Sequence, residues 1–245
     1  AERMKSDGRK IPAWVQTMLN KGFTSFYGFD GKVKTYYDPS SESMQPVPTH
    51  PLAVDFNVVK KTGGLIKKDW SASLIDLGDG VAAVTMHSVL QPTFNPIDGS
   101  VISMLDQAVD WVIENNYKGL VIASEATHFS AGANLALMLR AIDEKDWDGL
   151  DAMSKAMQDT LQKVRFASFP VVAAPHWMAF GGGYETIGAC DPIVAAAELY
   201  TGLVEVGVGL IPGAGGNLRM IMKAQDRLSK GRAGAFQVAQ KAFEA

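Results

Sequence analysis

Two glutamates of the sequence lie among apolar neighbours, where a carboxylate is unusual. Glu185 belongs to the run Gly182–Cys190, which begins on glycines and is predicted to be a helix, and Glu205 lies within Leu203–Gly207. Apolar surroundings disfavour the charged form of a carboxyl group, so its pKa rises toward the range where it can exchange protons near neutral pH. Two such groups could share one water molecule. From spacing alone, it is equally open that both glutamates are exposed ends of their elements.

Glycines at positions 181–183 stand at the start of this predicted helix. The first N–H groups of a helix have no partner within it and carry partial positive charge, and glycines let a ligand oxygen come close to them. Small residues also occur in Phe129–Leu135, directly after the apolar run Gly119–Ala123. A backbone N–H of that segment could point at the same oxygen, as in an oxyanion hole. Taken alone, each cluster is more often a tight turn between a strand and a helix.

Other familiar kinds of site are missing from the sequence. The glycines of Gly207–Gly213 miss the G-x-G-x-x-G spacing by one residue, and neither glycine cluster continues into Gly-Lys-Ser/Thr. No G-x-S-x-G supplies a hydrolase nucleophile. The four histidines lie in separate segments and Cys190 is the single cysteine, so we expect no metal site. The lone cysteine predicts a reducing compartment, the cytoplasm or a eukaryotic organelle matrix.

Composition predicts a globular protein with a sizeable core. Of the 245 residues, 47% are apolar and 20% are charged. The net charge of −3 is spread without long like-charge runs, so the basic surface that nucleic acid requires is missing. No apolar stretch approaches the roughly 20 residues of a membrane-spanning helix.

From about residue 70 the apolar periodicity predicts an α/β architecture. Asp98 is expected to cap a helix with one apolar face, and the methionine-rich face of a second helix is expected to fill the core. The predicted strands are 73–77, 81–87, 119–123, 171–174 and 192–197. Four helices are predicted: one after Asp98, one over 150–166, one over 182–190 and a last one from about Ala214. The apolar face of the first is expected to contain Ile102, Leu105, Val109, Val112 and Ile113. That of the second is expected to contain Met153, Met157, Leu161 and Val164.

The first 69 residues follow a different pattern. They predict a short helix over 11–19 and a β-hairpin of 23–29 and 33–37 around Asp30-Gly31. Four prolines between residues 38 and 51 predict an extended linker. Residues 52–69 carry no clear pattern. We therefore expect an N-terminal extension and linker over 1–69 and a second domain over 70–245.

Three segments of this second domain resemble the signatures of the crotonase, or enoyl-CoA hydratase/isomerase, superfamily. They are His128–Leu135, Ala179–Glu185 and Gly202–Gly216, and they occur in the family's order and with its separation. The resemblance covers roughly residues 72–220. It implies a crotonase-like spiral of ββα units, assembled as homo-oligomers based on trimers.

The resemblance also implies roles for individual residues. The N–H groups of Ala133 and Gly182 would bind the thioester oxygen, and Glu185 and Glu205 match the pair that hydratases place around the attacking water. The family often has Asp where Asn134 stands, which puts a structural contact in doubt more than the chemistry. The residues implied in binding the acyl-CoA substrate are Asn95, Ile97, Ala131, Gly132, Asn134, Leu135 and Gly213.

The implied activity is hydration of trans-2-enoyl-CoA in fatty-acid β-oxidation. Coenzyme A would be part of the substrate, so no separate cofactor is expected. Isomerisation of Δ3- to Δ2-enoyl-CoA is the alternative within enzymes, and some family members catalyse both reactions. A non-catalytic acyl-CoA-binding module is the alternative outside enzymes, although the joint presence of both carboxylates and both glycine clusters argues against it.

The first thirty residues are similar, over a shorter stretch, to the tail of the 3-hydroxyacyl-CoA dehydrogenase domain of two-domain β-oxidation enzymes. This similarity predicts that the chain is the hydratase part of a dehydrogenase fusion. Few residues follow Gly216 compared with the family, so we expect a truncated domain with an exposed apolar patch and reduced activity and stability. We also expect Ala214–Ala245 to depart from the family's conformation while 72–212 keep the fold.

Overall fold

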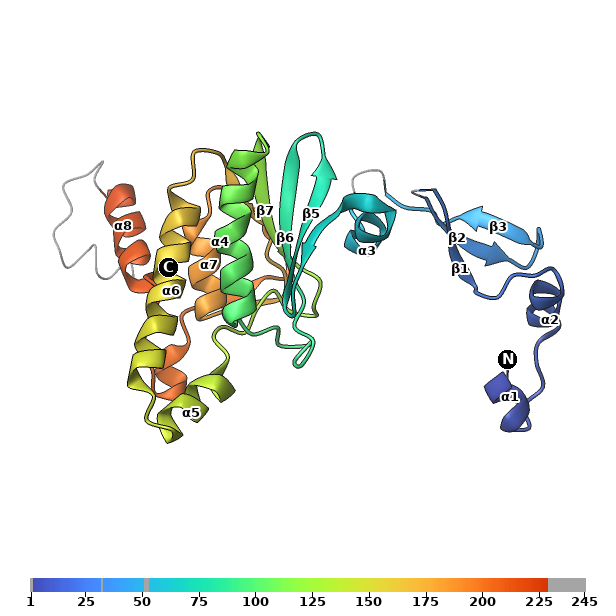
Figure 1. Cartoon of the computed structure of the whole chain (residues 1–245), viewed down its shortest axis with the longest axis horizontal. Coiled ribbons are helices and arrows are strands. Elements are labelled where there is room, and N and C mark those ends of the chain that lie inside the picture. The colour runs from blue at the N-terminus through green and yellow to red at the C-terminus, as the bar shows by residue number, and fades with distance from the viewer. Residues whose placement is uncertain (1, 32, 51–52, 229–245) are drawn as a thin grey trace. The chain divides into compact units, whose positions relative to one another are not determined.

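The computed structural model describes residues 2–31, 33–50 and 53–228 (Figure 1). The chain divides into two compact units, one that ends at Gly64 and one that begins at Leu65. This boundary lies a few residues before the expected start of the second domain. The reason is that Leu65–Lys68 form a strand, β4, which pairs with the main sheet of the second unit.

The first unit contains short helices and a three-stranded antiparallel sheet. The expected helix is α2, Ala13–Asn20. The expected hairpin forms, but its first strand is Tyr27–Asp30 rather than 23–29, and Asp30 pairs with Val33 instead of lying in the turn. Tyr37 is fully buried and contacts the ring of Phe23. The elements of this unit are α1 (Glu2–Ser6), α2, β1 (Tyr27–Asp30), β2 (Val33–Asp38), β3 (Ser43–Pro46), α3 (Phe56–Val59) and the π-type turn Lys60–Gly64.

The expected extended linker over 38–51 is wrong in part, because β3 lies within it. β3 pairs antiparallel with β2, and Pro46 at its end lies opposite Thr35. β3 is an edge strand of the order β1-β2-β3. A proline lacks the N–H that a central strand needs, but an edge strand can accommodate it.

A five-stranded mixed sheet forms the centre of the second unit, in the order β4-β5-β6-β7-β8. β5 runs antiparallel to both of its neighbours, β4 and β6, whereas β6, β7 and β8 are parallel. The predicted hairpin is confirmed: Gly78, Asp79 and Gly80 all have positive φ at its turn. The strands are β5 (Ala72–Gly78), β6 (Val81–Met86), β7 (Gly119–Ser124) and β8 (Val171–Ala173).

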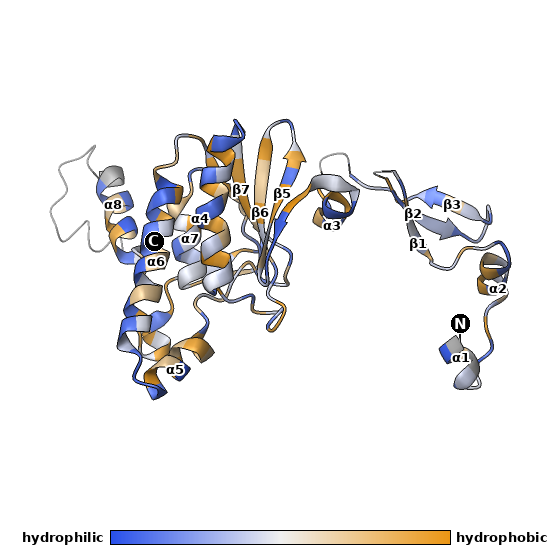
Figure 2. Ribbon diagram, viewed as in Figure 1, coloured by the Kyte–Doolittle hydropathy of each residue, from blue (hydrophilic) through white to orange (hydrophobic). Residues whose placement is uncertain are grey.

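Helices α4 (Gly99–Glu114), α6 (Trp147–Arg165) and α7 (Gly182–Ala189) cover one side of this sheet (Figure 1). α4 packs on β5, β6 and β7 and against α6, and α6 packs against α7. The Asp98 cap is confirmed, since its Oδ1 accepts hydrogen bonds from the N–H groups of Ser100 and Val101. Figure 2 shows β6 and β7 as largely apolar, which agrees with their place in the core.

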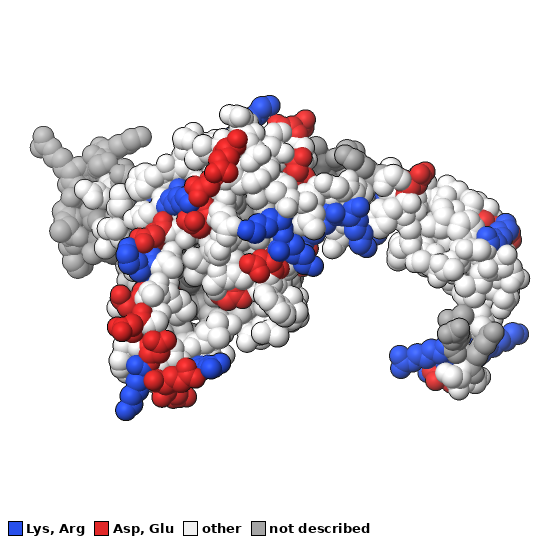
Figure 3. Space-filling model, in the orientation of Figure 1, with Lys and Arg blue, Asp and Glu red and all other residues white. Residues whose placement is uncertain are grey.

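The outer faces of α4 and α6 carry charges of both signs. Lys163 of α6 pairs with Asp106 at 3.0 Å and with Asp110 at 2.7 Å, both on α4. Figure 3 shows acidic and basic side chains next to each other on this face. None of the helices within the described ranges is long and apolar enough to cross a membrane.

The C-terminal part of the unit differs from expectation. The predicted strand 192–197 is wrong: Ile193 makes only an isolated bridge to Ala173, since Pro192 lacks an N–H and the run is mostly solvent-exposed. The remaining elements are α5 (Leu135–Asp143), the parallel pair β9 (Met178–Phe180) and β10 (Tyr200–Gly202), the 3₁₀ turn η2 (Glu205–Val208) and α8 (Gly216–Leu228). Expectations for 229–245 lie outside the described residues.

Within α4 the expected apolar face is wrong at one position. Leu105 is fully buried and Val112 is also buried, but Ile113 is 53% exposed. Each residue turns a helix by about 100°, so Ile113 leaves the face that its neighbour Val112 occupies.

This difference gives a matched test of the core. We expect Leu105→Ala to lower the free energy of unfolding by about 2–5 kcal/mol, because it removes buried side-chain volume. Ile113→Ala should change it by less than about 0.5 kcal/mol. Urea unfolding of both variants measures the difference, and equal losses would contradict this packing of α4.

Candidate active site

A cavity of about 390 Å³ lies in the second unit. Four of the residues that line it are those assigned to catalysis from the sequence: Ala133, Gly182, Glu185 and Glu205. They come from the loop before α5, from α7 and from η2. The fold therefore brings three segments that are distant in the sequence to one wall.

Glu185 is buried in α7, with 3% of its surface exposed. Its Oε1 accepts hydrogen bonds from the backbone N–H groups of Ala214 at 2.8 Å and Gly216 at 2.7 Å. Burial raises the pKa of Glu185; the two N–H donors oppose this rise, the charge of Glu205 adds to it, and Arg219 opposes it. The carboxyl group is thus fixed in position while its pKa moves toward the range useful for proton transfer.

Glu205 begins η2 and lies next to Gly181. A Cβ atom on Gly181 would be 3.0 Å from Oε1 of Glu205, and Gly181 has a φ of +52°. Both the space and the backbone conformation therefore favour glycine at this position. The Oε2 atom of Glu205 is buried and has no hydrogen-bond partner within the described part of the chain. This oxygen is available to a bound molecule.

The N–H groups of Ala133 and Gly182 lie close together. A Cβ atom on Gly182 would be 3.5 Å from the Ala133 nitrogen, and one on Gly132 would be 2.9 Å from the Phe180 carbonyl oxygen. Neither N–H donates to any acceptor among the residues the structure describes. Two such donors on a cavity wall can stabilise a developing oxyanion.

Backbone pairing between the two loops holds these donors in place. Ile97 bridges to Ala133, and Ser130 bridges to Ala179 of β9. The short strand β9 then leads directly into Gly181 and α7. The loop before α5 is therefore attached on both of its sides, once to Ile97 and once to the strand that precedes α7.

The structure places five of the seven residues expected to bind substrate on the same cavity. These five are Ile97, Ala131, Gly132, Leu135 and Gly213. Asn134 does not line the cavity; its Oδ1 accepts a hydrogen bond from the Leu137 N–H at 3.4 Å and caps α5.

Asn95 is also absent from the cavity wall, and its side chain is used within the protein. Its side chain is 1% exposed. Its Oδ1 accepts a hydrogen bond from the Ser88 N–H, and its Nδ2 donates to Ser124 Oγ and to the Phe129 carbonyl. All these partners belong to the protein, so Asn95 holds the loop that precedes α4 rather than facing a ligand.

An apolar wall of the cavity was missed in the sequence. It includes Met138 and Ile142 of α5 and Trp147 and Leu150 of α6. The signal was present, because Asn134 is a good N-cap residue and an apolar run follows it.

The methionine-rich face of α6 has two roles. Met157, Leu161 and Val164 are buried in the core, as predicted. Met153 and Met157 also line the cavity, so the assignment of this face to core filling alone is corrected.

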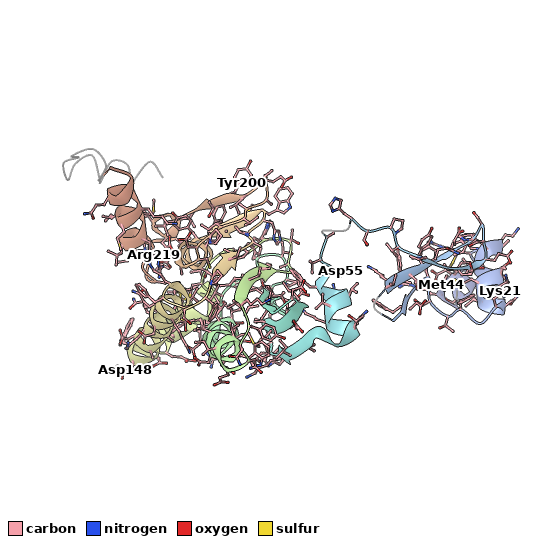
Figure 4. All side chains as sticks on the ribbon, turned by 90° about the horizontal axis from the view of Figure 1, so that it is seen from above. Lys21, Met44, Asp55, Asp148, Tyr200 and Arg219 are labelled. Carbon is pink, nitrogen blue, oxygen red and sulfur yellow. The ribbon has the colours of Figure 1, made fainter. Side chains whose placement is uncertain are left out.

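Arg219 of α8 is the other residue that the sequence did not point out. It is 6% exposed, and Figure 4 marks it on α8. Its Nη1 donates to the carbonyl oxygens of Glu185 and Ala214. Nothing in the sequence pattern around a single arginine of an amphipathic helix indicates such burial.

Comparison with known proteins agrees with this arrangement. A family model described as enoyl-CoA hydratase/isomerase matches residues 76–233. The chain belongs to the enoyl-CoA hydratase/isomerase family. The resemblance drawn from the three signature segments is thereby confirmed, and the protein is a crotonase-family enzyme.

Two relatives are longer proteins. A Bacillus subtilis protein named as a 3-hydroxyacyl-CoA dehydrogenase is 39% identical over 217 residues, which are 89% of this chain and 27% of the relative. A Rickettsia prowazekii protein named as a fatty acid oxidation complex trifunctional enzyme is 30% identical over 76% of this chain and 26% of the relative. The chain thus spans about a quarter of the length of these relatives. The first alignment includes part of the unit that ends at Gly64.

Solved structures give the fold. An enoyl-CoA hydratase from Thermoplasma volcanium superposes with a TM-score of 0.58 at 21% identity, covering 72% of this chain and 64% of that one. The second unit has the crotonase fold, as the signature segments predicted.

The pKa of Glu185 predicts a pH-dependent contribution to stability. Because its pKa is raised in the folded state, the folded protein holds the proton at pH values where the unfolded chain has released it. The stability of the wild type relative to Glu185→Gln should therefore be greatest below the ordinary value of 4.5 and fall as the pH rises through the folded-state pKa. Urea unfolding across pH 4–8 measures the free energy of unfolding of both proteins, with the exposed Glu114→Gln as the control. If the stability of the wild type relative to Glu185→Gln grew with pH, the burial of Glu185 would be contradicted.

Proposed function

We propose that this chain catalyses the syn addition of water to a trans-2-enoyl-CoA, giving a 3-hydroxyacyl-CoA in fatty-acid β-oxidation. The observation that carries the proposal is the meeting of two carboxyl groups, Glu185 and Glu205, with two available N–H groups on one cavity. Isomerisation needs only one base to move a proton, whereas hydration needs a base for the water and an acid for the carbon. The second carboxyl group therefore favours hydration.

Substrate binding follows from the cavity wall. The thioester oxygen accepts hydrogen bonds from the N–H groups of Ala133 and Gly182, and the acyl chain lies against the apolar residues of α5 and α6. The thioester brings coenzyme A with it, so the proposed reaction uses no separate cofactor. Apolar surroundings strengthen the hydrogen bonds to the thioester oxygen.

In the proposed chemistry, Glu185 accepts a proton from water as the water oxygen bonds to C3. The electrons of the C2–C3 double bond move toward the thioester oxygen, where the two N–H groups stabilise the enolate. Glu205 then gives a proton to C2, and its unpartnered Oε2 supports this role. Proton exchange from Glu185 back to Glu205 restores both groups.

We also propose that the chain works as the hydratase part of a larger multifunctional protein. The relatives named for dehydrogenase and trifunctional activities, each far longer than this chain, support this proposal. A trimer-based homo-oligomer is the assembly that the family resemblance suggests. The molar mass of the full-length protein in solution tests that assembly.

Each carboxyl group should be required for hydration. We expect Glu185→Gln and Glu205→Gln to lower kcat for crotonyl-CoA hydration by about 10²–10⁴-fold, because an amide cannot transfer protons as a carboxyl group does. Glu114→Gln should leave the rate unchanged. Undiminished turnover in either active-site variant of the full-length protein would contradict the assignment.

The backbone N–H donors should matter for the hydration rate about as much as the two carboxyl groups. Gly132→Ala would place a methyl group 2.9 Å from the Phe180 carbonyl oxygen at a φ of +99°, and so displace the neighbouring Ala133 N–H. We expect kcat to fall by about 10²–10³-fold. Gly202→Ala is the matched control, since its Cβ would meet nothing within 4 Å. Equal rates in the two variants would argue against the oxyanion hole.

Substrate choice separates the alternatives. Initial rates with 2-enoyl-CoA and with 3-enoyl-CoA, measured separately, distinguish hydration from isomerisation. Tight acyl-CoA binding without turnover of either substrate in the full-length protein would instead indicate a non-catalytic binding module.

A further inference from the structure

The guanidinium group of Arg219 is buried beside the proposed base. Arg219 is 6% exposed, and its Nη1 donates to the Ala214 carbonyl at 2.8 Å and to the Glu185 carbonyl at 3.3 Å. Figure 4 labels it on α8. No carboxylate forms a salt bridge with it among the residues described here. A buried charge without such a partner is costly, so its position calls for a reason.

Arg219, Ala214 and Glu185 form one hydrogen-bond network. The Ala214 N–H donates to Oε1 of Glu185, and the Ala214 carbonyl accepts from Arg219. Arg219 in turn donates to the main-chain carbonyl of Glu185. The guanidinium group therefore binds the backbone of Glu185 directly and its side chain through Ala214.

The loop 214–216, which belongs to this network, is tightly packed. The Arg219 N–H donates to the Gly215 carbonyl at 3.0 Å, and Gly216 supplies the second N–H bond to Glu185. Gly215 has a φ of +94°, and a Cβ there would be 3.3 Å from Nη1 of Arg219. On the other side, a Cβ on Gly188 of α7 would be 3.6 Å from Cδ of Arg219. The arginine fills the space between α7 and the loop that holds the carboxyl group.

We propose that Arg219 is a positioning residue, which sets the place and the charge environment of the Glu185 carboxyl group through the 214–216 loop. This role rests on the proposed hydratase function. Lysine could keep the charge but has no planar fork, so it could reproduce the electrostatic part of the role better than the geometric part.

The charges around Glu185 and Arg219 define how Arg219 should affect the pH dependence of the proposed hydration. Glu205 raises the pKa of Glu185, and Arg219 lowers it. Arg219 in turn interacts with Arg165 of α6 and with Cys190, whose pKa burial raises to about 12. Without the charge of Arg219, only the N–H groups of Ala214 and Gly216 still oppose the rise that burial and Glu205 cause in the pKa of Glu185.

The test uses the full-length protein with Arg219→Gln, Arg219→Lys and the control Arg140→Gln, whose side chain is exposed on α5. We expect Arg219→Gln to lower kcat for crotonyl-CoA hydration by about 10–100-fold with little change in KM, as misplacement of a reacting group can. The acid limb of its kcat/KM profile should move to higher pH, because the positive charge that opposes protonation of Glu185 is lost. Arg219→Lys should keep the limb near its wild-type position with a smaller loss of kcat, and Arg140→Gln should match the wild type in both.

The outcomes separate the two proposals. A wild-type protein without hydratase activity overturns the proposed function. An active wild type with an unmoved acid limb in Arg219→Gln overturns the role of Arg219, even if kcat falls. Should Arg219→Gln fail to fold, Arg219→Lys decides: a loss of kcat at unchanged KM and an unmoved limb supports the role, and wild-type kcat overturns it.

Discussion

The close approach of two backbone segments is the constraint on which the site depends. The chain at 130–133 and the chain at 180–183 come so near each other that a methyl group on Gly132 or Gly183 would collide with the opposing backbone. Only residues without Cβ permit this approach. It brings the N–H groups of Ala133 and Gly182 to one wall of the cavity, and it places α7, with Glu185, directly behind them. The bridge from Ser130 to Ala179 keeps the two segments together, and within it the Phe180 N–H donates to the Ser130 carbonyl.

The second constraint concerns the buried carboxyl group. Glu185 keeps its place because two backbone N–H groups satisfy one of its oxygens, whereas Oε2 of Glu205 is buried without a partner in the described chain. The two carboxyl groups thus differ in environment although they share one cavity. Such a difference allows one group to act as a base and the other as an acid. The apolar wall from α5 and α6 lowers the local polarity around both groups.

The structure differs from the sequence-based predictions where a local pattern meets a tertiary requirement. Pro46 indicated a linker, but an edge strand needs no N–H on its outer side, so β3 could form. The apolar run after Asp191 resembled a strand but makes only isolated bridges. The apolar face expected on α4 included Ile113, which the packing leaves 53% exposed. In each case the outcome depends on which other segment of the chain packs against these residues, and the periodicity of the sequence does not specify that.

The sequence by itself determined the elements that local rules govern. The cap at Asp98, the hairpin at Gly78–Gly80, the glycines before α7 and the order of the three signature segments could all be recognised, because caps, turns and close backbone approaches demand particular residue types. Only the tertiary structure decided what surrounds Glu185. The N–H groups of Ala214 and Gly216, the guanidinium of Arg219 and the wall of α5 come from segments up to about fifty residues away along the chain. Their contact with Glu185 is set by packing, a non-local interaction that leaves no periodic trace in the sequence.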